Sequence, residues 1–378
     1  MERVATGVRA DLAQRAADLG LSETHEDGAR YLVADVGYAL DKAEIDELYD
    51  ASVELERMCL ELVDRVVNED LLDRFDLSPL AARLVADSWD RQARNLIGRF
   101  DLAWRPGQPP KLLEYNAETP VGLVEAARFQ AEWCAAAVPG ALQFNEIEGR
   151  LVEAWRNFGL PRLPVHFAGT PDDAEASLTL DFLAATARAA GFEAVRLDLD
   201  AVGWDGEKFL DADDRPIRTL FKLYPWAWLV EDEFGPNIEI SGLTAIEPAW
   251  KMLLADKRML PLLWEMHPGH PNLLPAGMNA RDVAGPAAAK PALGRDGAGV
   301  KLYANGLSAA ATAGDAEEPA EQDGPLVYQA MAELAKTGPV TVLASTWMVA
   351  SQPAGLALRE ADGDFVGAAA RFVPHFVR

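Results

Sequence analysis

The chain has 378 residues, of which 49% are hydrophobic, and 60 acidic against 35 basic side chains give it a formal charge of −25. This length favours two or three packed units over one ordinary core. The acidic balance argues against a nucleic-acid partner, because such binding rests on cations that neutralise phosphates. It permits a cationic substrate, and it also serves solubility.

The two cysteines and the first residues bear on the cellular location. Cys59 and Cys134 lie in apolar, helix-like runs and form no disulfide framework, so we expect buried thiols in a reducing compartment. The opening stretch MERVATGVRA is charged from its second residue and lacks the apolar core of a signal peptide. No window approaches 18 uninterrupted apolar residues. We therefore expect a cytoplasmic protein without a membrane span.

The first 95 residues or so have helical patterns. Asp41, with Glu44 three positions later, predicts the capped start of a helix. Apolar residues then recur at steps of three and four as far as Val66, which predicts one buried stripe. Ser78 followed by Pro79 predicts a second helix start.

From residue 96 onward, predicted strands and helices alternate, which favours an α/β (α+β) fold class. Strands are expected at 96–104, 111–116, 163–169, about 192–199 and 244–248, and helices at 121–137, 145–158, 176–190 and around 251–254. The final hundred residues have the pattern of β-strands joined by glycine-rich turns. Small residues, acids and proline dominate 306–324, which predicts a mobile connection.

Polar residues mark two consecutive strands in RFDLAWRPGQPPKLLEYNAETP, residues 99–120. Arg99 and Asp101 share one strand face, as do Glu114 and Asn116, because residues i and i+2 project the same way. If the strands pair across the Pro/Gly turn, the four side chains converge. Their oxygens suit Mg²⁺ that holds nucleotide phosphates, and the arginine suits a carboxylate or phosphoryl group. A solvated hairpin face with a salt bridge explains the same pattern.

A glycine-rich loop follows a predicted strand that ends at Lys290. Gly294, Gly297 and Gly299 let backbone N–H groups wrap an anion, and the lysine adds a point charge for phosphates. The loop has neither the Walker pattern nor the helix that follows a Rossmann turn. Strand, loop and strand fit a flap over a triphosphate, and they also fit an ordinary glycine-rich hairpin.

Lys257 lies at a break between two helical runs, where a lysine is usually solvated. His267 and His270 flank a Pro-Gly pair, but no cysteine or further histidine is close in sequence. We therefore do not expect zinc.

Six separated segments, in this order, resemble the glutathionylspermidine synthase family, and more closely its stand-alone synthetase-like members. They are RFDLAW, LLEYNAETPVGLVEAARFQ, FKLYPWAWLVEDEFG, EPAWKMLLADKRMLPLLWEMHPGHPNLLPA, KPALGRDGAGV and GLALRE. The resemblance covers about residues 20–378. It implies an ATP-grasp fold of the glutathionylspermidine synthetase type, with several subdomains around a nucleotide cleft. It also implies an ATP- and Mg²⁺-dependent ligase that joins a peptide-like carboxylate to an amine through an acyl phosphate.

The resemblance further implies roles for individual residues. The catalytic arginines that meet the phosphates and the acyl phosphate would be Arg99 and Arg359. The Mg²⁺ ligands would be Asp101, Glu114 and Asn116. The ATP-binding residues would be Lys257, Lys290, Gly294, Arg295, Gly297, Gly299, Tyr328 and Gln329. Thr119 falls where bifunctional members have a serine that touches glutathione, and the acids Glu231 and Asp232 are candidates for attracting a cationic amine.

The chain also departs from the family pattern. It shows no cysteine amidase, so hydrolysis of the amide is not expected. Val121 replaces a second serine of the glutathione site, and Leu229 stands where an acid that holds the polyamine is expected, so the acid and the amine stay unassigned. We expect subdomains at 1–95 (helical), 96–245 (metal- and substrate-binding) and 246–378 (ATP-binding, with a lid). A phosphotransferase or ATPase on the same fold and a non-catalytic nucleotide-binding protein remain alternatives.

Overall fold

The computed structural model describes residues 1–7, 11–25, 28–161, 163–170, 173–295, 297–303, 324–363 and 365–378. The connection predicted at 306–324 lies outside these residues except for its last one. Both cysteines are free and buried, as expected. In the described part of the chain, no helix is both long and apolar enough to cross a bilayer.

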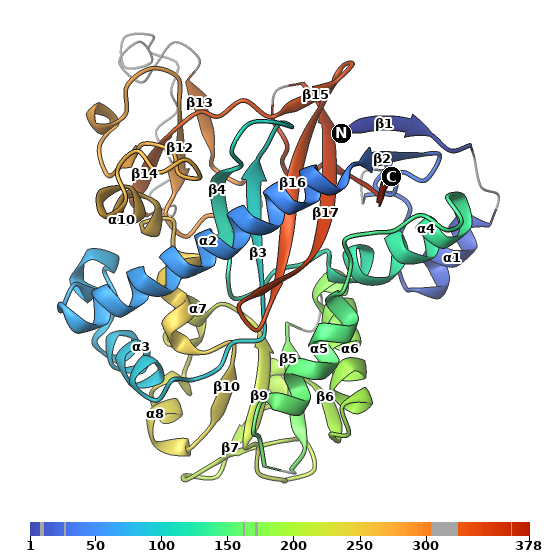
Figure 1. The fold of residues 1–378 in the computed structure, drawn as a ribbon. Helices are drawn as coiled ribbons and strands as arrows, with labels where there is room; N and C mark the ends of the chain where they lie inside the picture. The colour runs from blue at the N-terminus through green and yellow to red at the C-terminus, as the bar shows by residue number, and fades with distance from the viewer. Residues whose placement is uncertain are drawn as a thin grey trace.

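An antiparallel sheet forms the centre of the molecule, with the strand order β18-β17-β16-β3-β4 and β15 paired to β16 (Figure 1). Its strands are β3 (Ile97–Ala103), β4 (Lys111–Asn116), β15 (Ala335–Thr337), β16 (Val340–Val349), β17 (Gln352–Asp362) and β18 (Arg371–Val373). All residues of β3 and β16 are buried. Polar side chains on these two strands therefore need partners inside the protein.

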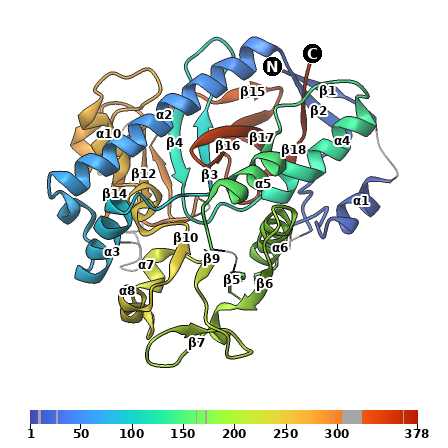
Figure 2. The same cartoon turned by 60° about the horizontal axis from the view of Figure 1, so that its bottom comes forward.

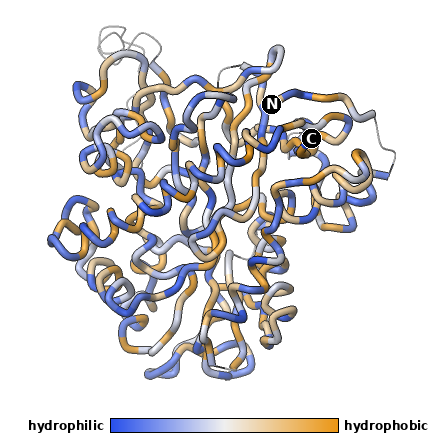
Figure 3. The backbone as a smooth tube through the Cα atoms, in the orientation of Figure 1, coloured by the Kyte–Doolittle hydropathy of each residue, from blue (hydrophilic) through white to orange (hydrophobic). Residues whose placement is uncertain are grey.

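The long helix α2 (Lys42–Asn68) crosses this sheet diagonally (Figure 1). Asp41 and Glu44 form the predicted capping box at its start. Hydrophilic and hydrophobic stretches alternate along α2 in Figure 3, and the buried stripe faces the sheet. The short helix η1 (Leu72–Phe75) and α3 (Pro79–Asp90), which is capped by Ser78 as predicted, follow it.

A second sheet is parallel throughout, in the order β10-β9-β5-β6. Its strands are β5 (Val165–Gly169), β6 (Ala194–Asp198), β9 (Thr219–Leu223) and β10 (Thr244–Ile246). The helices α5 (Ile147–Asn157) and α6 (Ala174–Ala189) lie beside β5 and β6 in Figures 1 and 2. Between the central and the parallel sheet, the chain forms a π-helix, η2 (Glu125–Phe129), and then α4 (Gln130–Ala137).

Short elements complete this region. They are η3 (Leu199–Ala201), β7 (Gly203–Trp204), β8 (Phe209–Leu210), α7 (Trp226–Leu229), η4 (Gly235–Asn237) and α8 (Ile238–Ser241). The turn predicted at Pro225 is the N-cap of α7.

A third sheet is antiparallel, with the order β11-β14-β12-β13. Its strands are β11 (Ala276–Gly277), β12 (Ala287–Pro291), β13 (Lys301–Tyr303) and β14 (Leu326–Ala330), and the nearby helices are η5 (Ala249–Lys251), α9 (Met252–Ala255), α10 (Met259–Met266) and η6 (Ala280–Asp282). The pairing of β12 with β13 confirms the predicted strand, glycine loop and strand.

A small sheet joins the two ends of the chain. It contains β1 (Glu2–Ala5), β2 (Val36–Leu40) and the C-terminal β19 (His375–Val377), and α1 (Leu12–Asp18) lies between the first two strands in sequence. Figure 1 shows both termini beside it. Helical patterns in the first 95 residues do not predict β1 and β2, which pair with each other, nor the pairing of β2 with a strand more than 300 residues later.

Candidate active site

The hairpin of β3 and β4 pairs Arg99 with Asn116 and Asp101 with Glu114. A bulge follows Asp101, where the register shifts by one residue. The side chains converge as predicted: the amide nitrogen of Asn116 lies 3.3 Å from Asp101 Oδ2 and 3.3 Å from Glu114 Oε1. Of the two alternatives, the structure favours a built cluster over a solvated hairpin face, because Asp101 is only 3% exposed.

Asp101 is the centre of a charged network between three strands. Arg99 donates to both of its carboxylate oxygens, at 2.9 and 3.0 Å. Ser345 on β16 donates to Oδ1 at 2.7 Å, and Arg359 on β17 donates to Oδ2 at 2.8 Å. Burial alone would raise the pKa of Asp101, but the charges of the two arginines outweigh it and lower that pKa. Asp101 is therefore ionised and holds both guanidinium groups in place.

The oxygen atoms of this cluster fit a magnesium ion by their chemistry. Among the described residues, no group of three or more His, Cys, Asp or Glu side chains is suited to a metal. The cluster instead offers the two carboxylates of Asp101 and Glu114, to both of which the amide nitrogen of Asn116 donates, and the amide oxygen of Asn116 is its third candidate ligand. Mg²⁺ is usually held by one or two carboxylates together with substrate phosphates and water. The donor set thus suits an ion that arrives with a nucleotide.

Lys290 reaches the same cluster from the third sheet. Its Nζ donates to Gln329 Oε1 at 2.7 Å and to the carbonyl oxygen of Leu113 at 2.9 Å. Gln329 in turn donates to the carbonyl oxygen of Leu112 at 2.9 Å, so β12 and β14 are tied to the edge strand β4. Burial lowers the pKa of Lys290 to about 8.

These residues line one cavity, which we call cavity A. Its charged lining residues are Arg99, Asp101, Glu114, Lys290 and Arg359, and its apolar lining includes Ala288, Val300, Leu302, Met331, Leu343 and Phe365. Gly297 borders it with a φ of +76°, and a Cβ there would lie 3.0 Å from the Phe365 ring. Only glycine fits this position well. Cavity A therefore combines charged side chains of both signs with apolar ones.

A second cavity, cavity B, lies on the other side of Glu114. Lys257 forms an ion pair of 3.2 Å with Glu114 and donates a hydrogen bond to the carbonyl oxygen of Gly294. Arg295 on the glycine loop donates to Thr119 Oγ1 at 3.0 Å. The guanidinium carbon of Arg295 also lies 5.6 Å from the centre of the Trp228 ring.

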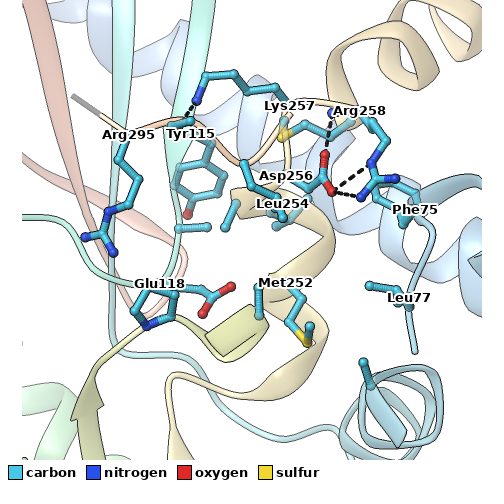
Figure 4. Close-up of a pocket in the computed structure, with 18 of the residues that line it drawn as sticks. Phe75, Leu77, Tyr115, Glu118, Met252, Leu254, Asp256, Lys257, Arg258 and Arg295 are labelled. Carbon is cyan, nitrogen blue, oxygen red and sulfur yellow. Dashed lines mark hydrogen bonds and ion pairs between the residues drawn. The ribbon is translucent and has the colours of Figure 1, made fainter. Parts of the chain in front are cut away.

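Figure 4 shows cavity B with Arg295 and Glu118 on one side and Phe75 and Leu77 on the other. Between them lie Met252 and Leu254 of α9. The loop that carries Arg295 thus covers one end of cavity B.

The remaining predicted residues are not all brought to one place. Glu231 lines cavity B, whereas Asp232 lines a third cavity, cavity C. Cavity C has an apolar floor that includes Leu220, Ile238 and Leu243. Tyr328 and Gly299 are described but do not belong to the lining of these three cavities, although each lies within two residues of one that does.

Several residues of the site were not predicted from the sequence. Ser345 contacts Asp101. The one feature of the sequence that could have indicated Ser345 is its hydroxyl within an otherwise apolar strand. Glu118 accepts hydrogen bonds from the backbone N–H of Trp226 at 2.8 Å and from Lys222 at 3.4 Å. Its position next to Thr119 was the only hint. Lys222 is fully buried, so this pair fixes the loop before α7 to the end of β4.

Comparisons with known proteins identify the relatives of this chain. The profile of the glutathionylspermidine synthase preATP-grasp family matches residues 3–378. The chain is 33% identical to a putative acid–amine ligase of Haemophilus influenzae, over 100% of this chain and 99% of that protein. It is 28% identical to the bifunctional glutathionylspermidine synthetase/amidase of Escherichia coli and 26% identical to the trypanothione synthetase of Crithidia fasciculata. These alignments cover 71% and 80% of this chain, but only about half of each relative (48% and 50%).

A solved structure of a glutathione synthetase-like effector from Globodera pallida resembles the fold. The TM-score is 0.62 at 12% identity, over 97% of this chain and 96% of the other. At that identity the likeness shows the fold alone, and it agrees with the mixed α/β class predicted from the sequence. The prediction of an enzyme of the ligase class agrees with the names of the sequence relatives. With a full-length profile match, this chain belongs to the glutathionylspermidine synthase family.

Proposed function

We propose that the protein is an ATP- and Mg²⁺-dependent ligase that joins a carboxylic acid to an amine through an acyl phosphate. One observation carries the proposal. Arg99, Arg359 and Lys290 line cavity A together with two carboxylates suited to Mg²⁺. Three cations beside such oxygen ligands suit two anions held in contact, a triphosphate and a carboxylate.

We assign a separate proposed role to each group of residues. Asp101, Glu114 and Asn116 are proposed to hold Mg²⁺, which would neutralise charge on the nucleotide phosphates when bound. Lys290 and Lys257 are proposed to contact the phosphates, and the loop with Gly294, Arg295, Gly297 and Gly299 to exclude water from them. Gln329, which contacts Lys290, is proposed to border the nucleotide in cavity A, with Tyr328 beside it in sequence. Arg99 and Arg359 would orient the acid and stabilise charge on the transferred phosphoryl group.

The proposed reaction has two steps. A carboxylate oxygen forms a bond to the γ-phosphorus, and the bond from that phosphorus to the β,γ-bridging oxygen breaks, which releases ADP. The neutral amine nitrogen then bonds to the acyl carbon, and the bond from that carbon to the phosphate oxygen breaks. Of the two protons that the ammonium group loses overall, one ends on the released phosphate and one goes to solvent.

Relatives of this chain suggest the classes of substrate. Their names include glutathionylspermidine synthetase and trypanothione synthetase, which favours a peptide-like acid and a polyamine-like amine. Thr119 is proposed to contact the acid, and Glu231 and Asp232 to attract the amine. Val121 and Leu229 differ from the residues expected for glutathione and spermidine, so related acids and amines are the first candidates.

A product assay tests the proposal. The purified chain is supplied with Mg·ATP, and peptide-like carboxylates are crossed with polyamines and amino acids while ADP and amide are both quantified. The proposal expects equal amounts of ADP and amide for one pairing, and a hydroxamate when hydroxylamine replaces the amine. The variant Asp101→Asn serves as the inactive control and the exposed Asp50→Asn on α2 as the active one.

The alternatives predict other products. A phosphotransferase or ATPase releases ADP without consuming an amine. A nucleotide-binding protein without activity binds Mg·ATP and gives neither product, and either result would overturn the ligase assignment.

A further inference from the structure

We propose, on the basis of the proposed function, that Tyr115 and Glu56 are positioning residues for the Mg²⁺ site of the β3–β4 hairpin. Tyr115 lies between the proposed ligands Glu114 and Asn116 on β4 and projects to the opposite face of the strand. Its hydroxyl donates a hydrogen bond of 2.9 Å to Oε2 of Glu56 on α2. The long helix is thereby tied to the strand that carries two of the three proposed ligands.

The position of β4 in the central sheet explains why its ligands need such support. Among the described strands, β4 pairs with β3 alone, so it forms an edge of the sheet. Its bulge leaves Leu113 without a register partner on β3, and the carbonyl oxygen of Leu113 instead accepts the hydrogen bond from Lys290. The ladder with β3 is thus interrupted directly before Glu114. Because Mg²⁺ demands near-ideal octahedral geometry, its ligands tolerate little displacement.

Packing holds the ring of Tyr115 as well as the hydrogen bond does. The ring stacks on Phe100, its register partner on β3, with the ring centres 3.9 Å apart. Gly98 makes room for it, because a Cβ at that position would lie 2.6 Å from the tyrosine oxygen. Since Gly98 and Phe100 flank Arg99, the ring contacts both strands that supply the charged cluster. Tyr115 borders cavity B but is only 3% exposed, so we infer that it acts through its neighbours and not on a substrate.

Glu56 is a costly residue for the core in which it lies. Its neighbours on α2 include the buried Leu55 and Cys59, which belong to the same hydrophobic core as Tyr115. Glu56 is 3% exposed, and within the described part of the chain its Oε1 atom has no hydrogen-bond partner. Folding alone favours an apolar side chain at such a position. What the acid adds is the hydrogen bond to Tyr115, which supports a role in placing β4.

Nucleotide binding to the whole chain, with and without the metal, tests this inference. Calorimetry measures the affinity for ATP with Mg²⁺ and for ATP with EDTA, and urea denaturation measures the stability. Tyr115→Phe removes only the hydroxyl and should weaken Mg·ATP binding about tenfold, while the affinity for metal-free ATP should change less than about twofold. Glu56→Gln keeps an oxygen that accepts from Tyr115, so it should bind Mg·ATP within about twofold of the unchanged chain.

The double variant Tyr115→Phe with Glu56→Leu separates positioning from folding. It replaces both partners by apolar side chains, so the urea midpoint should return toward that of the unchanged chain. The affinity for Mg·ATP should stay about tenfold low, because the hydrogen bond between α2 and β4 is still absent.

Thr186→Val is the matched control, because it removes another buried hydrogen bond, the 3.0 Å contact from Trp155 on α5 to Thr186 on α6. It should lower the stability and leave Mg·ATP binding unchanged. Equal losses of binding in this control, no loss in Tyr115→Phe, recovery of binding in the double variant, or an unchanged chain that binds no Mg·ATP would each overturn the inference. If Mg·ATP binding depends on Tyr115 but no acid and amine give an amide, the inference holds and the proposed function fails.

Discussion

Replacing Asp101 by asparagine keeps the size of the side chain and removes its charge. The change leaves Arg99, with a side chain only 8% exposed, without the carboxylate that it contacts at 2.9 and 3.0 Å. Arg359 loses a 2.8 Å contact to the same group. Removing one partner of a buried charge pair costs about 3–5 kcal/mol, because the other charge stays buried. We therefore expect Asp101→Asn to lower the free energy of unfolding by this amount.

Asp101→Asn should also lower the catalytic activity by more than its loss of folding stability accounts for. Asp101 is a proposed Mg²⁺ ligand and also positions both proposed catalytic arginines, so we expect kcat/KM to fall by about 10³-fold, or ~4 kcal/mol. Ser345→Ala is the control, since it removes one hydrogen bond to Oδ1 of Asp101 and keeps every charge. It should cost about 1 kcal/mol of stability and little activity.

Urea denaturation followed by circular dichroism gives the stability, and ADP release as a function of Mg²⁺ concentration gives the activity. The double variant Asp101→Asn with Arg359→Gln should recover part of the lost stability, because it removes one stranded charge. If Asp101→Asn keeps the stability and the Mg²⁺-dependent activity of the unchanged protein, both the network and the metal assignment are wrong.

Three further predictions concern other parts of the structure. Lys290, with a pKa lowered to about 8 by burial, should lose its proton above that pH, so the Mg·ATP affinity measured by calorimetry should fall from pH 8 to 9 and stay level in Lys290→Arg. Burial lowers the pKa of His375 from its usual value of 6.5 to about 3, so between these two pH values the unfolded chain binds a proton that the folded chain does not. Stability should therefore fall by up to about 1.4 kcal/mol per pH unit below pH 6.5, and urea titrations of His375→Gln should lack this contribution. Trp228→Leu removes the ring that Arg295 contacts. Because Trp228 is 52% exposed, the free energy of unfolding should stay the same while KM rises about two- to fivefold. An unchanged KM would show that the ring has no part in the site.

Local signals account for the parts of the fold that the sequence predicted well. The cap at Asp41, the start of α3 at Ser78 and the bounds of β4 each depend on residues a few positions apart. The convergence of Arg99 with Asn116 follows from alternation along two strands and one turn. The roles of Lys257 and Arg359 came from the family resemblance instead, because a lone lysine or arginine carries no local signal.

Long-range pairing accounts for what was missed. Ser345 meets Asp101 only because β16 pairs with β3 in one register across more than 240 residues. The strand β2 pairs with β1 on one side and with β19, more than 300 residues later in the chain, on the other. The side-chain pattern of one strand does not name its partner strand, because the pairing depends on residues elsewhere in the chain.

The sequence by itself determined the chemical inventory of this protein: the carboxylates, arginines, lysines and glycines, and the faces of the strands on which they lie. Only the tertiary structure decided how that inventory is divided. It places Glu231 and Asp232 in different cavities, and it surrounds Asp101 with Arg99, Ser345 and Arg359. The physical reason is that charge pairing depends on distances between segments far apart in the chain, and packing of the sheets and helices sets those distances.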